Sequence, residues 1–189
     1  MAMQQNGYAI VPHLTYDEWR NYALTHGVNV DWTWGNQCWD ICALLWYQYG
    51  LRLQTGNGYA YGCWTLMRDV NARGPFKQIN NIRDVKRGDC VVFNRTGSFY
   101  TGHIAFADED YNGSGRLRCL GQNQGQGISS GTPSNVVSMG VGNFLGAFRN
   151  TNWRQTPPPT PPTPPTPSST KRFDKFPWVL YANRLIRHR

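Results

Sequence analysis

Charged side chains are scarce in this 189-residue chain, at 16% of the residues against roughly 25% in a typical soluble protein. This scarcity argues against a coiled coil or a long helical bundle, and the 40% of apolar residues argues against a disordered chain. Glycine (20) and tryptophan (8) are plentiful instead. The composition therefore indicates a loop-rich globular domain that handles polar, ring-bearing ligands.

Three further signals are missing. No apolar run approaches the roughly 20 residues of a membrane span, and residues 1–14 lack the charged start and apolar stretch of a secretory signal. The five cysteines contain no C-x-x-C pair, which disfavours a disulfide framework and a structural zinc site. They are Cys38, Cys42, Cys63, Cys90 and Cys119. We expect a protein made in a reducing cytosol.

A proline-rich segment divides the chain. Residues 157–167 read PPPTPPTPPTP, which predicts an extended spacer of about 3.1 Å per residue. We therefore predict a globular domain over residues 1–155, a linker over 156–170 and a short basic, aromatic tail over 171–189.

The tail carries most of the net charge. Residues 168–189 hold six Lys/Arg and one acid, so +5 of the total +8 lies there and the body is only mildly basic. A basic tail suits an anionic polymer or surface, and a tail kept basic for solubility is the equally weighted alternative. The near-neutral body makes nucleic acid an unfavoured partner.

Hydrophobic patterning in the domain predicts helices first and strands later. Thr15 with Glu18 three residues on predicts a capped helix from Thr15 to about Thr25. Further helices are expected over 37–49 and, more weakly, 62–70. Short strands are predicted over residues 89–94, 102–108, 116–123 and 143–149. This order predicts an α+β fold with an antiparallel meander.

One cysteine and one histidine lie at positions suited to nucleophilic catalysis. Cys38 begins the helix expected over 37–49, where the helix dipole favours thiolate. His103 alone among the histidines starts an apolar strand. A cysteine on the first turn of a helix and a histidine on a following sheet form a papain-like pair. The alternative is a buried cysteine and a strand-end histidine with structural roles only.

The surrounding residues favour the catalytic interpretation. The segments Gly35-Asn-Gln-Cys-Trp-Asp40, Lys86-Arg-Gly-Asp89, Thr101-Gly-His-Ile-Ala-Phe106 and Leu120-Gly-Gln-Asn123 follow one another in this order. The chain thereby resembles the CHAP family of cysteine- and histidine-dependent amidohydrolases/peptidases, common in bacteriophage lysins, over about residues 15–150. The resemblance implies a papain-like α+β fold and cleavage of an amide bond in peptidoglycan.

Roles carried over from the family rest on single matched positions. Cys38 would be the nucleophile and His103 the general base and then acid. The family's third position is usually an acid followed two residues later by asparagine, and here these fall on Gly121 and Asn123. Asn123 is therefore expected to orient the histidine, with Gln122 as the weaker candidate. The backbone N–H of Cys38, helped by Gln37, is a reasonable oxyanion site.

Oxygen-bearing residues precede the cysteine. Asn29, Asp31, Thr33, Gly35 and Asp40 have the spacing of a calcium-binding loop, although Trp34 stands where glycine is expected. Some phage CHAP domains similarly place calcium before this helix. With only two carboxylates, a polar turn with Asp40 facing solvent is slightly favoured. No cofactor is required for the cysteine chemistry, and calcium would act by holding the loop.

Aromatic residues are concentrated beside the predicted site. We expect Trp46 in the core, and Trp32 and Trp34 lining a substrate groove. The resulting hypothesis is a phage lysin or virion-associated hydrolase that is made in the host cytoplasm. It acts on bacterial peptidoglycan as an N-acetylmuramoyl-L-alanine amidase or an endopeptidase of the stem or cross-bridge. The tail would dock on the wall, on an acidic lipid surface or on phage virion subunits. The alternative is a non-catalytic wall-binding or phage structural protein with the same fold.

Overall fold

The computed structural model describes residues 3–5, 8–10, 14–56, 58–69, 73–97, 100–125 and 132–154. The chain divides into two compact units, Met1–Gln155 and Thr156–Arg189. All of the described residues belong to the first unit. The predicted linker and basic tail lie outside the described residues.

After the short strands at residues 3–5 and 8–10, the described elements run from helices to the strands of the main sheet, which confirms the predicted α+β class. The helices are α1 (Tyr16–Thr25), α2 (Cys38–Tyr47), α3 (Gly62–Leu66) and the short 3-10 helix η1 (Ile82–Asp84). The strands are β1 (Met3–Gln5), β2 (Tyr8–Ile10), β3 (Phe76–Ile79), β4 (Cys90–Phe93), β5 (His103–Ala107), β6 (Arg116–Gly121), β7 (Asn135–Gly140) and β8 (Phe144–Asn150). No helix in these ranges has the length and apolar character to cross a bilayer.

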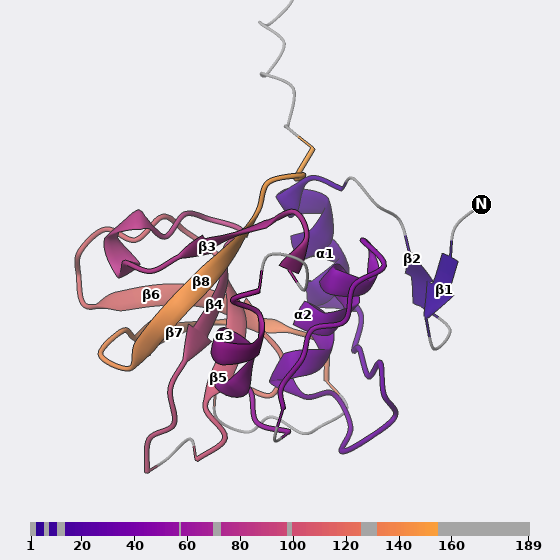
Figure 1. The fold of residues 1–189 in the computed structure, drawn as a ribbon, viewed down its shortest axis with the longest axis horizontal. Coiled ribbons are helices and arrows are strands. Elements are labelled where there is room, and N and C mark those ends of the chain that lie inside the picture. Colours follow the sequence, from indigo (N-terminus) through magenta and orange to yellow (C-terminus); the bar gives the residue numbers. More distant parts are fainter. Residues whose placement is uncertain are drawn as a thin grey trace, which may run out of the picture. The chain divides into compact units, whose positions relative to one another are not determined.

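Six strands form one antiparallel sheet in the order β3-β8-β4-β5-β6-β7. Strands β4 to β7 form the predicted meander, and β8 returns to pair with both β4 and β3 (Figure 1). β1 and β2 pair separately. The sequence prediction missed β1, β2, β3 and β7, and it placed the ends of α2 and α3 too late.

Alternate residues of the central strands face two different cores. Val92, Ile104 and Phe106 join the helices in one apolar cluster, in which Trp46 is fully buried as expected. Their neighbours Phe93 and Ala105 belong to a second cluster on the other face. This period of two is the side-chain alternation of a strand buried on both faces. α2 packs directly on β5, which brings the two elements that carry Cys38 and His103 together.

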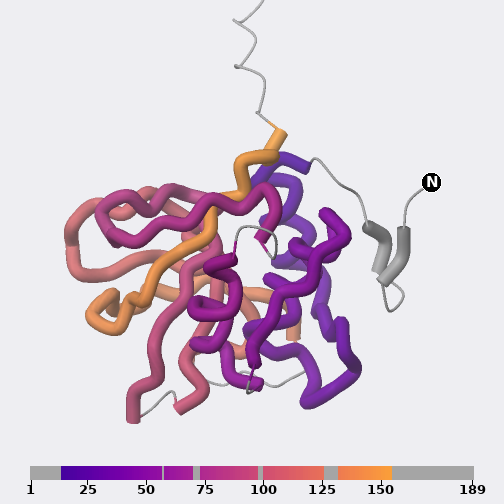
Figure 2. Tube along the Cα trace, viewed as in Figure 1, coloured from indigo at the N-terminus to yellow at the C-terminus, as the bar shows by residue number. Residues whose placement is uncertain are grey.

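Two local interactions fix the helices beside this sheet. The Thr15 side chain accepts from the Glu18 N–H while the Glu18 carboxylate accepts from the Thr15 N–H, which completes the predicted capping box of α1. After α2 the chain turns back along that helix toward α3 (Figure 2). In this segment Trp39 Nε1 donates to the Leu53 carbonyl at 3.1 Å.

Candidate active site

Cys38 is the first residue of α2, with Gln37 as N-cap, and its side chain is half-buried. Burial raises the pKa of the thiol to about 11, while a hydrogen bond from the Ile104 N–H acts in the opposite direction. The expectation that the helix start would favour thiolate is therefore not met, because desolvation outweighs it. The hydrogen bond places the sulfur beside β5, at the residue that follows His103.

The loop that leads into Cys38 is held by buried polar side chains. Asp40 accepts from the N–H groups of Gln37 (2.7 Å) and Val30 (2.9 Å). Gln122 accepts from the Val28 N–H at 2.7 Å and donates to the carbonyls of Val28 and Gln37. Asp40 is thus buried, at 1% exposure, and does not face solvent as the polar-turn interpretation expected. Together these bonds fix where α2 begins.

His103 opens β5 and is only 2% exposed. The preceding Gly102 has φ +66°, and a Cβ there would lie 2.6 Å from the Phe93 carbonyl oxygen and 2.7 Å from Tyr61 Cβ. Only glycine fits this turn. The backbone therefore requires the glycine of the Gly-His pair, because this turn sets where β5 begins and where the imidazole lies.

The hydrogen bonds of Gln124 determine which nitrogen of His103 is basic. Gln124 Nε2 donates to the carbonyls of Cys119 and Asn135, each at 2.9 Å. Since both amide hydrogens are used, Oε1 accepts from His103 Nε2–H, also at 2.9 Å. Nδ1 then carries the basic lone pair of a neutral imidazole. Burial lowers the pKa of His103, and the Gln124 bond partly offsets this.

Gln124 occupies the space of the acid that this chain lacks. A Cβ on Gly121 would lie 2.9 Å from Gln124 Oε1, so a side chain at position 121 and the Gln124 amide compete for one volume. The predicted orienting residue, Asn123, is exposed and donates instead to Gln37 Oε1 at 2.9 Å. Gln122, the second candidate, serves the loop before α2. Sequence reasoning missed Gln124, although a second glutamine directly after Gly-Gln-Asn was a visible signal.

Gln37 has one group left for an oxyanion. Its backbone N–H is committed to Asp40, and its Nε2 donates one hydrogen to the Trp34 carbonyl. Among the described residues no acceptor engages the second Nε2 hydrogen, which lies next to Cys38 in the chain. The side chain is therefore the part of Gln37 that could help the Cys38 N–H hold an oxyanion.

Trp32 and Trp34 are 70% and 83% exposed in the loop before α2. Both have left-handed backbones, with φ +58° and +62°, which is rare for a bulky residue. Exposed indoles held at strained positions are typical of surfaces that bind a ligand. Trp34 lines the cleft described below and Trp32 is not among its lining residues, whereas Trp46 and Trp64 lie in the core.

Residues 27–123, about half of the chain, match the CHAP domain family, and they include Cys38 and His103. The chain belongs to the CHAP domain family. Its similarity to the D-alanyl-L-alanine endopeptidase of Streptococcus phage B30 is 30% identity over 114 residues, which is 59% of this chain and 25% of that protein. The chain thus spans a quarter of that relative's length.

The wild-type endolysin LysIME-EF1 has a solved structure with the same fold. It matches with a TM-score of 0.58 and 22% identity, over 74% of this chain and 65% of the endolysin chain. This likeness shows the fold alone. The roles of single residues are argued from the geometry described above.

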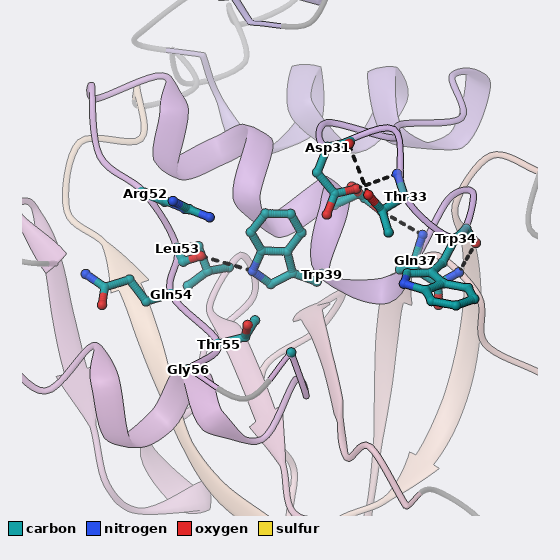
Figure 3. Close-up of a pocket in the computed structure, with 12 residues that line it drawn as sticks. Asp31, Thr33, Trp34, Gln37, Trp39, Arg52, Leu53, Gln54, Thr55 and Gly56 are labelled. Atoms are coloured by element: carbon teal, nitrogen blue, oxygen red, sulfur yellow. Dashed lines mark hydrogen bonds between the residues drawn. The ribbon is translucent and has the colours of Figure 1, made fainter.

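A cleft of about 590 Å³ opens beside α2 of this CHAP domain, between residues 31–40 on one side and residues 52–56 and 58 on the other (Figure 3). Asp31 and Asp40 both line it. Burial, with a contribution from the Asp31 charge, raises the pKa of Asp40 to about 7. A cation here would relieve this repulsion between like charges.

The donors for a calcium ion are present in part. Asp31 Oδ1 also accepts from the Thr33 N–H at 2.9 Å, and the left-handed Trp34 supplies the turn that a calcium loop makes at its glycine. However, no group of three or more His, Cys, Asp or Glu side chains converges within the described ranges. A calcium ion would therefore need neutral oxygens as well, and Asn29 and Thr33 are the side chains in sequence that carry them.

Proposed function

We propose that this CHAP domain is a peptidoglycan hydrolase that cleaves an amide bond with Cys38 as nucleophile. The observation that carries the proposal is the fixed tautomer of His103, whose Nδ1 is left basic by the Gln124 amide. The packing of α2 on β5 supports it by placing the thiol next to the start of that strand.

The proposed reaction follows from the two protonation states. Since both the thiol and the imidazole are neutral at rest, His103 Nδ1 must take the thiol proton as sulfur attacks the carbonyl carbon. The Gln37 Nε2 hydrogen and the Cys38 N–H would stabilise the oxyanion. The imidazolium then protonates the leaving amine as the C–N bond breaks, which leaves a thioester. Water, deprotonated by His103, releases the carboxylate and regenerates the thiol.

Gln124 is a positioning residue in this scheme. Of the proposed reacting groups it bonds only His103, and as a neutral amide it fixes the ring without adding a charge that would hold the imidazolium. An amide fits a base that must accept and then release a proton near neutral pH.

The relative from phage B30 favours one type of bond. Its name places cleavage between D-alanine and L-alanine, in the peptide part of the wall. We propose an endopeptidase activity of this type ahead of cleavage next to muramic acid, and a phage lysin or virion-associated enzyme as its setting. Mass analysis of fragments released from purified walls tests this, because the new amino and carboxyl termini identify the bond.

A non-catalytic wall adaptor is the second candidate function. It is supported only by the exposed Trp32 and Trp34, which suit binding without chemistry equally well. The same wall digestion decides between the two, since an adaptor binds walls and releases no new termini.

Calcium is proposed as a structural ligand of Asp31 and Asp40. Chelation should then lower the melting temperature reversibly, because a ligand of the native state stabilises it by mass action. Asp31→Ala should abolish the response to calcium, whereas Asp84→Ala, at an exposed acid outside the cleft, should not. An unchanged melting temperature over a calcium titration removes the calcium proposal and leaves the hydrolase proposal standing.

A further inference from the structure

The cleft beside α2 is lined by the two chain neighbours of Cys38 and contains an indole. Gln37 and Trp39, the neighbours of Cys38 in the chain, both line it. Because Trp39 Nε1 donates to the Leu53 carbonyl, the indole plane is fixed between the two walls (Figure 3). Cys38 is not among the lining residues, so the link between the cleft and the thiol is made by its two chain neighbours, Gln37 and Trp39.

Arg52 stands on one wall of the cleft with its charge uncommitted. It is exposed, and across the described part of the chain no hydrogen bond or ion pair engages its guanidinium. Other arginines are paired with carboxylates: Arg20, Arg87, Arg118, Arg149 and Arg154. A guanidinium presents a planar fork of donors that matches a carboxylate.

The opposite wall carries the opposite sign. Asp31 lies on the other side of the Trp39 indole from Arg52 (Figure 3). An anionic group entering the cleft is attracted at the Arg52 wall and, while no cation is bound to Asp31, repelled at the Asp31 wall, so the pair imposes one orientation. Gln54 and Thr55 add polar side chains next to Arg52.

We propose that this cleft is the subsite for the wall peptide next to the scissile bond, and that Arg52 anchors it through a peptide carboxylate. The inference rests on the proposed function, because cleavage at Cys38 requires that the flanking peptide occupy a path leading from that residue. It adds a specificity-determining residue: peptides whose carboxylate is amidated should be poorer ligands.

Binding to the full chain carrying Cys38→Ala tests this without turnover. The probe is a synthetic stem tetrapeptide, L-Ala-γ-D-Glu-L-Lys-D-Ala with free ends, titrated calorimetrically with calcium present and with chelator. Arg52→Gln should weaken binding about tenfold, as expected for the loss of a solvent-accessible charge-assisted pair. The fully amidated peptide should bind with that weakened affinity to both forms.

Arg83→Gln is the matched control, because Arg83 is likewise exposed, its side chain is likewise uncommitted and it lies outside the cleft. It should bind as tightly as the parent. In the active enzyme, Arg52→Gln should raise KM about tenfold with kcat unchanged, which a merely destabilised variant would not do. If Cys38→Ala still digests walls, the proposed function fails while the binding experiment remains interpretable.

Two results with the peptide probe would overturn the subsite, and a third comes from another polymer. One is equal affinity of the free and amidated peptides for the parent protein. The other is unchanged peptide affinity in Arg52→Gln. Binding of polyglycerol phosphate without binding of the peptide would also overturn it, since the cleft would then recognise an anionic polymer of the wall.

Discussion

The two ends of β5 each bury a polar group, and they satisfy it by different means. At one end His103 is 2% exposed and is bonded to the neutral amide of Gln124. Just past the other end Asp108 is 7% exposed, accepts two hydrogen bonds from Arg20 at 2.6 and 3.0 Å, and accepts a third from the Tyr16 hydroxyl. β5 thus has a buried neutral hydrogen-bond network at one end and a buried ion pair at the other.

The difference separates a structural device from a chemical one. A buried carboxylate paired with arginine keeps its charge, and it ties α1 to the sheet through Tyr16 and Arg20. A buried imidazole held by an amide has no fixed counter-charge from that partner, and its lowered pKa keeps it neutral. The first arrangement holds helix and sheet together, and the second allows a proton to be taken up and released.

The largest effect is expected from removing the chemical groups. Cys38→Ala and His103→Ala should each reduce kcat for wall digestion by about 10³ or more, since each eliminates one step of the reaction and little core volume. Release of new amino termini from purified walls measures this. Cys119→Ala, which removes a buried thiol from the second apolar cluster, should retain kcat. Digestion at the parent rate by either site variant would show that the neutral end of β5 has no chemical role.

Substitutions at the ion-paired end of β5 should lower the free energy of unfolding and leave kcat unchanged. Asp108→Ala leaves Arg20 and Tyr16 without their shared acceptor and should cost about 3 kcal/mol of unfolding free energy. Asp110→Ala is the surface control, because its pair with Lys86 is 57% exposed on both sides and such pairs contribute less than about 1 kcal/mol.

Urea unfolding measures both Asp108→Ala and Asp110→Ala, and kcat at low temperature should match the parent in each. If the Asp108 variant stays folded but loses kcat, both ends of β5 contribute to activity and the distinction between them is wrong.

The sequence predicted the features that depend on residues close together in the chain. The α1 cap follows from Thr15 and Glu18, and the positions of Cys38 and His103 follow from a helix start and a Gly-His turn. β3 and β7 escaped because they are the edge strands of the sheet, where half-exposed residues such as those of Asn135–Gly140 lack a clear alternation.

Long-range contacts explain the remaining errors. Asp40 was expected in solvent because its bond from the Val30 N–H forms only when the loop folds. Its bond from the Gln37 N–H is a local capping-box contact that the sequence analysis overlooked at this helix. Gln124 was missed because its role depends on the carbonyls of Cys119 and Asn135, which meet only when β6 and β7 pair. Motif spacing pointed to Asn123, one residue away.

The smallest effect is expected from changing Gln124, the hydrogen-bond partner of His103. It tests the comparison most directly, because a carboxylate in this place would make the His103 end of β5 charged like the Asp108 end. Gln124→Ala should lower kcat roughly 10- to 100-fold, the usual cost of losing a group that orients a reactive histidine.

Gln124→Glu instead supplies a carboxylate, which favours the imidazolium and raises the pKa of His103. In the parent the lowered pKa of His103 puts the acid limb of kcat/KM below the ordinary histidine value of about 6.5. In Gln124→Glu the base stays protonated to higher pH, so that limb should move upward.

The double variant Gly121→Glu with Gln124→Ala offers an independent route to the same state. Removing the amide frees the volume that a side chain at position 121 needs, since a Cβ there would otherwise lie 2.9 Å from Gln124 Oε1. Its acid limb should move in the same direction as that of Gln124→Glu, whereas Gly121→Glu alone should lose stability through overlap with the amide. Profiles of kcat/KM from about pH 4 to 9, with unfolding measured in parallel, distinguish these outcomes. An acid limb that stays in place in both carboxylate variants would mean that the group bonded to His103 Nε2 does not set the proton affinity of the base.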